Sequence, residues 1–220
     1  MLPGLKAHWE SAASGRALPF VDVFCETGAF DLAQTRRILE QARALGFPLK
    51  VHADEFDNLG GTSLAAALGA ASADHLVATS EADIAALAGG DTVAVSLPGT
   101  PFGLGHTEFT PAKTMLAGGV LLALATDLNP GTTWCESMQM VIALACRYMG
   151  LTPAQAIAAS TINAAAAIQR ADEIGSLEAG KQADVLILDV PDYRFLGYRY
   201  GTNIAHKVIK AGVIYPVLSV

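Results

Sequence analysis

Five short apolar runs alternate with helix-like segments along the first 170 residues, and this alternation restricts the possible folds more than any other feature. The runs are rich in β-branched residues, and the last is apolar over nearly its whole length, as expected for a parallel strand covered on both faces. The expected strands lie at residues 20–25, 49–53, 74–77, 92–97 and 120–126. Strands that alternate with helices predict a parallel α/β layer.

Local signals indicate where the intervening helices begin and end. Asp31 is a good N-cap, and Gly46 is a typical residue just beyond a helix C-terminus. Ser80 begins a capping-box-like sequence, and Thr110-Pro111 combines an N-cap with a proline at the first helical position. Further helices are expected at residues 61–68, at 136–148 and from 152 onward.

Residues suited to catalysis follow three of these runs. The sequence reads VHADE at 51–55, DH at 74–75 and ATDLNPG at 125–131. The carboxyl ends of the strands form the catalytic rim of a parallel barrel. A histidine near a glutamate, a second histidine, and an aspartate before a Gly/Pro loop suit a metal-assisted hydrolytic site. A catalytic zinc usually has three protein ligands. The sequence contains no His-x-His pair and supplies only two convincing ligands.

Each of these residues also has a structural interpretation. A single histidine at a strand end, such as His52, is more often a hydrogen-bonded structural residue, and Asp74-His75 could be a hydrogen-bonding pair at a strand edge. Asp127 precedes a Gly/Pro loop, where aspartate is commonly a turn residue. The nearby Glu55 favours a functional role for His52, and the apolar strand before Asp127 favours one for that carboxylate.

Composition excludes several classes of partner. The formal net charge of −7 argues against a nucleic acid or an anionic membrane. The three cysteines lack CxxC spacing and fit reduced thiols better than a disulfide framework. The first twenty residues contain no continuous apolar run typical of a secretory signal, and the apolar run at 118–126 is too short to cross a bilayer. We therefore expect a cytoplasmic protein that binds neither a nucleic acid nor a membrane, while a small anionic substrate is still compatible with the charge.

The last fifty residues differ in character from the rest. A turn-rich stretch is followed by an expected strand at 183–189 and an expected hairpin at 206–215. We therefore expect two units, a partial (β/α) barrel at residues 1–170 and a small β unit at 171–220. A closed eight-stranded barrel needs about 250 residues, so five strands fit either part of a barrel or an open sheet.

Motifs along most of the chain carry a resemblance to a known family. They are VDVFCE at 21–26, HADEF at 52–56, SADHL at 72–76, ATDLNPG at 125–131, ESMQ at 136–139 and GSLEAGKQADVLILDVPDY at 175–193. The chain closely resembles the imidazolonepropionases, the histidine-degradation members of the amidohydrolase superfamily. The resemblance implies the C-terminal five strands of a TIM-like (β/α)8 metal-dependent hydrolase barrel, together with part of a small β-sandwich.

The resemblance also implies roles for individual residues. His52 and Asp127 correspond to ligands of one zinc or iron ion per complete site, and His75 corresponds to a histidine that assists catalysis together with Glu55 and Asp127. Substrate contacts are implied at Glu55, Asn129, Gly131 and Thr132. In such an enzyme the backbone N–H groups of residues 129–132 would suit a substrate carboxylate, because glycine lets the main chain approach closely.

The implied reaction is hydrolysis of the ring amide of 4-imidazolone-5-propionate to N-formimidoyl-L-glutamate. The first-strand His-x-His of the family does not occur in the chain, so we expect an N-terminally truncated form. Two alternatives stay open: another amidohydrolase that acts on a cyclic amide or heterocycle, and a catalytically inactive half-barrel. We expect a homodimer, or association through strand edges, because unpaired edges favour pairing with another chain.

Overall fold

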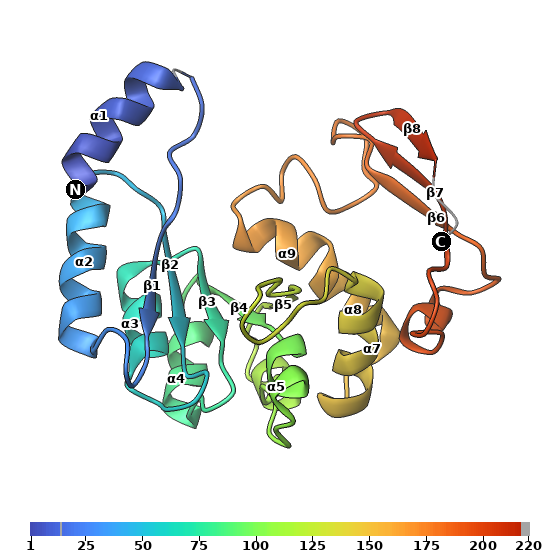
Figure 1. The fold of residues 1–220 in the computed structure, drawn as a ribbon, viewed down its shortest axis with the longest axis horizontal. Helices are drawn as coiled ribbons and strands as arrows, with labels where there is room; N and C mark the ends of the chain where they lie inside the picture. The colour runs from blue at the N-terminus through green and yellow to red at the C-terminus, as the bar shows by residue number, and fades with distance from the viewer. Residues whose placement is uncertain (14, 217–220) are drawn as a thin grey trace.

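A five-stranded parallel sheet forms the main unit of the computed structural model, which describes residues 1–13 and 15–216. Its strands are β1 (Val21–Cys25), β2 (Leu49–Ala53), β3 (Ser72–His75), β4 (Val93–Ser96) and β5 (Leu122–Leu124). They lie side by side in chain order (Figure 1). A doubly wound sheet reverses its strand order at a switch point, whereas a barrel does not. The order therefore follows the barrel type.

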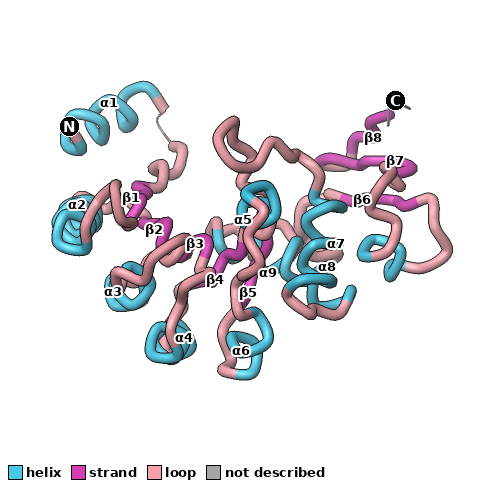
Figure 2. The backbone as a smooth tube through the Cα atoms, turned by 60° about the horizontal axis from the view of Figure 1, so that its bottom comes forward, coloured by secondary structure: helices cyan, strands magenta, loops and turns pink. Residues whose placement is uncertain are grey.

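Helices cover one face of this sheet. Figure 2 shows α2 (Leu32–Ala44), α3 (Gly61–Leu68), α4 (Glu81–Ala88) and α6 (Ala112–Ala117) in succession along that face. The other helices are α1 (Leu2–Ala12), α5 (Gly99–Leu104), α7 (Met138–Tyr148), α8 (Pro153–Ser160) and α9 (Ile162–Ala167). The main apolar core includes the fully or nearly fully buried side chains of Leu39, Val51, Leu76 and Leu124. Among the described residues, no helix has the length and apolar character needed to cross a membrane.

The opposite face of the sheet is polar on its first three strands. Asp22 pairs in register with Lys50, and His52 pairs with Asp74, so these side chains share one face. On β4 and β5 the corresponding face is apolar and packs against alanines of α9. The polar side chains of this face therefore lie on β1, β2 and β3.

Most of the predicted helix starts are confirmed. Asp31 and Ser80 are the N-caps of α2 and α4, and both form reciprocal capping boxes. Thr152 caps α8 in the same way, with Pro153 at the first helical position. The N-cap of α6 is Pro111, one residue later than the sequence predicts.

Two predicted strands have different boundaries. The strand expected at 74–77 ends at His75, because His75 and Leu76 adopt φ angles of 81° and 62°, which are incompatible with extended backbone. The strand expected at 120–126 is reduced to β5, since the N–H of Val120 still bonds to the carbonyl of Met115 in the preceding helix. Helices α1 and α5 were not predicted.

The C-terminal residues form a separate antiparallel sheet. Its strands are β6 (Val185–Leu188), β7 (Ala205–Lys210) and β8 (Val213–Pro216), which confirms the expected strand and hairpin. Figure 1 shows helices α7, α8 and α9 between the two sheets. The short 3-10 helix η1 (Tyr193–Gly197) packs on α7, and Leu196 and Ile204 are buried in the main core. The division at residue 170 stays a prediction, because part of this tail packs with the first unit.

Candidate active site

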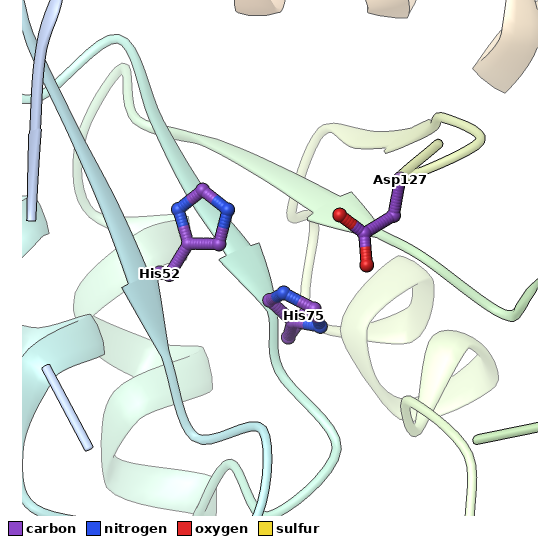
Figure 3. Close-up of side chains that lie close together, drawn as sticks. All are labelled: His52, His75 and Asp127. Atoms are coloured by element: carbon purple, nitrogen blue, oxygen red, sulfur yellow. The ribbon is translucent and has the colours of Figure 1, made fainter. Parts of the chain in front are cut away.

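Three side chains from distant parts of the sequence converge at the carboxyl ends of the strands. His52 lies on β2, His75 is the last residue of β3, and Asp127 follows β5. Figure 3 shows the carboxylate of Asp127 pointing toward the two imidazole rings. One nitrogen of each histidine and one Asp127 oxygen all lie within 4.8 Å of one another. This spacing could hold a metal ion.

Backbone strain is concentrated at the same edge of the sheet. Among the described non-glycine residues with positive φ are Asp54 (56°), His75 (81°), Leu76 (62°) and Asp127 (53°). Each lies at or just beyond the end of β2, β3 or β5. Left-handed conformations of this kind cost free energy and persist where the surrounding structure imposes them, often at functional sites.

His52 is held by a carboxylate of the neighbouring strand. Its Nδ1 lies 3.0 Å from Oδ1 of Asp22, which is on β1. Burial disfavours the charged imidazole, but the hydrogen bond and charge of Asp22 outweigh this effect, so the pKa of His52 is raised. An Nδ1–H bonded to Asp22 would leave Nε2 of the neutral ring free to bind a metal, as in the carboxylate–histidine pairs of metal sites.

His75 and Glu55 form a buried pair. His75 Nε2 lies 3.5 Å from Oε2 of Glu55, and the two side chains are only 3% and 8% exposed. Burial is the main reason that the pKa of His75 falls to about 4, an effect that the charge of Asp127 only partly offsets. Burial, and then the charge of Asp127, raises the pKa of Glu55 to about 7. Both shifts favour the neutral forms of the two side chains over an ion pair.

Asp127 is fixed by hydroxyl groups. Thr100, which lies on α5, donates a hydrogen bond from Oγ1 to Oδ2 of Asp127 at 2.6 Å. The Thr100 hydroxyl also lies 2.9 Å from the hydroxyl of Thr133, a buried residue that follows the Asp127 loop in the chain. The unpredicted helix α5 therefore places a donor that orients the carboxylate.

The loop that follows Asp127 is closed by the side chain of Asn129. Oδ1 of Asn129 accepts hydrogen bonds from the N–H groups of Gly131 and Thr132, each at 2.8 Å. The N–H of Asn129 itself bonds to the carbonyl of Thr133. These N–H groups are therefore engaged within the loop, contrary to the expectation that they are free to bind a substrate carboxylate. Substrate contact by Asn129, Gly131 and Thr132 stays a prediction.

A second set of potential ligands shares His52 with the first. Asp22, His52 and Asp74 also bring one ligand atom each within 4.8 Å. The Asp74 carboxylate is already bonded by Lys50 at 3.4 Å and by the Ser72 hydroxyl at 2.6 Å. A positive ammonium group at this position opposes a cation, so the set His52, His75 and Asp127 fits a metal better.

Sequence reasoning missed two residues that shape the site. Asp22 holds His52, and Glu26, which is 2% exposed, accepts hydrogen bonds from the loop that carries Glu55. A signal for Asp22 is present in the sequence, since a charged residue at an alternate position of an otherwise apolar strand indicates a polar inner face. The pairing of Asp22 with His52 could not be predicted in this way, because it depends on the register between β1 and β2.

Comparisons with known proteins show the family and the fold of the chain. The model of the amidohydrolase family matches residues 26–217. The imidazolonepropionase of Herpetosiphon aurantiacus is 55% identical over 212 residues, which are 96% of this chain and 50% of that protein. The imidazolonepropionase of Alkaliphilus oremlandii is 49% identical, over 97% of this chain and 49% of its own length. The chain thus spans about half the length of the curated relatives that it matches.

Solved structures share the fold at low sequence identity. An adenosine deaminase from Xanthomonas campestris with bound zinc superposes with a TM-score of 0.77 at 22% identity, covering 98% of this chain and 55% of that one. A guanine deaminase from E. coli superposes with a TM-score of 0.72 at 16% identity, over 98% of this chain and 60% of its own. The five parallel strands are part of a TIM-like (β/α)8 barrel, with part of a small β-sandwich beside it. The chain belongs to the amidohydrolase family.

Proposed function

We propose that this chain carries the carboxyl-terminal part of an imidazolonepropionase site. The reaction is hydrolysis of the ring amide of 4-imidazolone-5-propionate to N-formimidoyl-L-glutamate, a step of histidine degradation in the cytoplasm. The observation that carries the proposal is the convergence of His52, His75 and Asp127 at the strand ends in a chain 55% identical to an imidazolonepropionase. Identity at this level extends over 96% of the chain.

His52 and Asp127 would hold one zinc or iron ion, with His75 beside them. Imidazole nitrogen and carboxylate oxygen suit both metals. A buried atom supports the fit: Nδ1 of His75 has no hydrogen-bond partner among the described residues. An unpaired buried polar atom is costly, and a cation or a water molecule at this position would satisfy it.

When bound, the metal ion would polarise the ring amide and make water a better nucleophile at neutral pH. The chain's own residues would manage the protons. Asp127, oriented by the Thr100 hydroxyl, would accept a proton from the attacking water and return it to the ring nitrogen as the C–N bond breaks. In the metal-free chain burial raises the pKa of Glu55 to about 7, so this carboxyl group could hold or release a proton near neutral pH. Burial lowers the pKa of His75, whose neutral ring could donate a hydrogen bond to the developing oxyanion.

Other roles follow from the same assignment. Glu55, Asn129, Gly131 and Thr132 would contact the small-molecule substrate, the last three through side chains or carbonyl groups, since their N–H groups are engaged within the loop. Residues 1–170 would form the catalytic unit and residues 171–220 the small β unit. A homodimer, or association through the edges of β1 and β5, would complete the assembly.

The test is turnover by the purified chain loaded with zinc or iron. Loss of 4-imidazolone-5-propionate and appearance of N-formimidoyl-L-glutamate would be followed by mass spectrometry, with Asp127→Asn as the matched control. Product from the parent chain and none from the variant would support the proposal. A folded, metal-loaded chain without turnover would refute catalysis by this chain alone and favour the inactive half-barrel. Turnover of other cyclic amides in preference to this one would favour a different amidohydrolase.

A further inference from the structure

Glu26 makes an unusual set of hydrogen bonds at the end of β1. Its carboxylate is almost fully buried and accepts from four backbone N–H groups at 3.0–3.1 Å. Three of these donors are consecutive, the N–H groups of Glu55, Phe56 and Asp57 in the loop after β2. The fourth is the N–H of the adjacent Thr27. A side chain that directly follows β1 thus binds the main chain that follows β2.

These bonds fix the residue that faces His75. Asp54, directly before Glu55, adopts a left-handed φ of 56°, so the chain turns sharply at the end of β2. Charge-assisted hydrogen bonds are the stronger ones, and here they hold the main chain on the far side of that turn. Among the described residues, Nε2 of His75 is the only hydrogen-bond or ion-pair partner of the Glu55 carboxyl group. Glu55 therefore depends on its backbone for its position.

We infer that Glu26 is a positioning residue, which holds the loop of residues 55–57 so that the Glu55 carboxyl group faces His75. The inference rests on the role proposed above for Glu55. Glu26 itself is turned toward the backbone N–H groups and takes no part in proton transfer. Its carboxylate is suited to this task because both oxygens act only as acceptors, whereas an amide would present N–H groups to the same donors.

The test compares ring-nitrogen NMR signals of His75 at one fixed pH in the metal-free chain. In Glu26→Gln the shape is kept, but one of the two acceptor atoms becomes a donor. We expect the amides of residues 55–57 to exchange about tenfold faster or more, as for loss of a hydrogen bond to a charged group. The ring signals of His75 should shift as Glu55 moves away. Glu26→Asp keeps the charge on a shorter side chain and should shift the His75 ring signals in the same direction by a smaller amount. This variant tests the inference even if Glu26→Gln does not fold.

Two controls separate positioning from general destabilisation. Leu39→Ala removes a fully buried side chain of α2 from the apolar core on the helix-covered face of the sheet, and should leave the His75 signals in place. In a Glu55→Ala background, Glu26→Asp should add no further shift. Unchanged His75 signals in the folded Glu26 variants would overturn the inference, as would an equal shift in Leu39→Ala. Because no substrate is used, this result is independent of whether the chain hydrolyses imidazolone propionate.

Discussion

Replacement of Lys50 by methionine tests the polar inner face of the sheet. The Nζ atom of Lys50 lies 3.4 Å from Asp74 Oδ2, and the two side chains are 17% and 9% exposed. Burial raises the pKa of Asp74, and the charge of Lys50 opposes that rise. Removal of one member of a buried ion pair typically costs about 3–5 kcal/mol. Because Lys50 is partly exposed, we expect Lys50→Met to lower the free energy of unfolding by about 3 kcal/mol at neutral pH.

The loss should depend on pH in one direction. Without Lys50 the pKa of Asp74 in the folded chain rises further above its unfolded value of about 3.9. A carboxyl group with a raised pKa destabilises the folded chain at pH values above its pKa in the folded state. The destabilisation disappears at pH values below its pKa in the unfolded state. The cost of Lys50→Met should therefore be full at pH 7 and should shrink as the pH falls toward 4.

Urea unfolding at both pH values, followed by circular dichroism, measures this difference. Lys113→Met, at an exposed lysine on α6, is the matched control and should change the free energy of unfolding by less than about 0.5 kcal/mol. The double variant Lys50→Met/Asp74→Leu removes both charges and should be more stable than Lys50→Met alone. A Lys50→Met chain as stable as the parent at pH 7, or a double variant that is no more stable, would refute the reasoning.

Three further changes test the site and its frame. Asp22→Asn should lower the pKa of His52, since Asp22 supplies the hydrogen bond and charge that raise it; an unchanged NMR titration of the His52 ring would contradict this. Gly61→Ala should destabilise the chain by about 1–3 kcal/mol, because a new Cβ would lie 2.8 Å from the Cβ of Ala53. Unfolding in urea measures this loss of stability, and an unchanged stability would show that α3 can move aside. Asp31→Ala should cost about 1 kcal/mol through loss of the α2 cap, whereas Asp31→Asn should retain most of that stability.

Local structure followed closely from sequence signals that act over short distances. The capping boxes at Asp31 and Ser80 depend on residues three apart, so both helix starts could be predicted. The strand that ends at Ala53 was predicted with its observed limits. The end of β3 was not, because the left-handed backbone at His75 and Leu76 is imposed by the surrounding structure and has no signature in residue type. The strand expected at 120–126 begins later than predicted, because the N–H of Val120 bonds to the carbonyl of Met115 rather than to a neighbouring strand.

The sequence by itself determined the parallel α/β layer, the small antiparallel sheet and the three strand ends that bear His52, His75 and Asp127. These follow from periodicity and from the position of polar residues after apolar runs, which are local properties. Only the tertiary structure decided that Asp22 holds His52 and that Glu26 binds the loop of Glu55. Both contacts join neighbouring strands about thirty residues apart in sequence, so they exist only once β1 and β2 have paired in register.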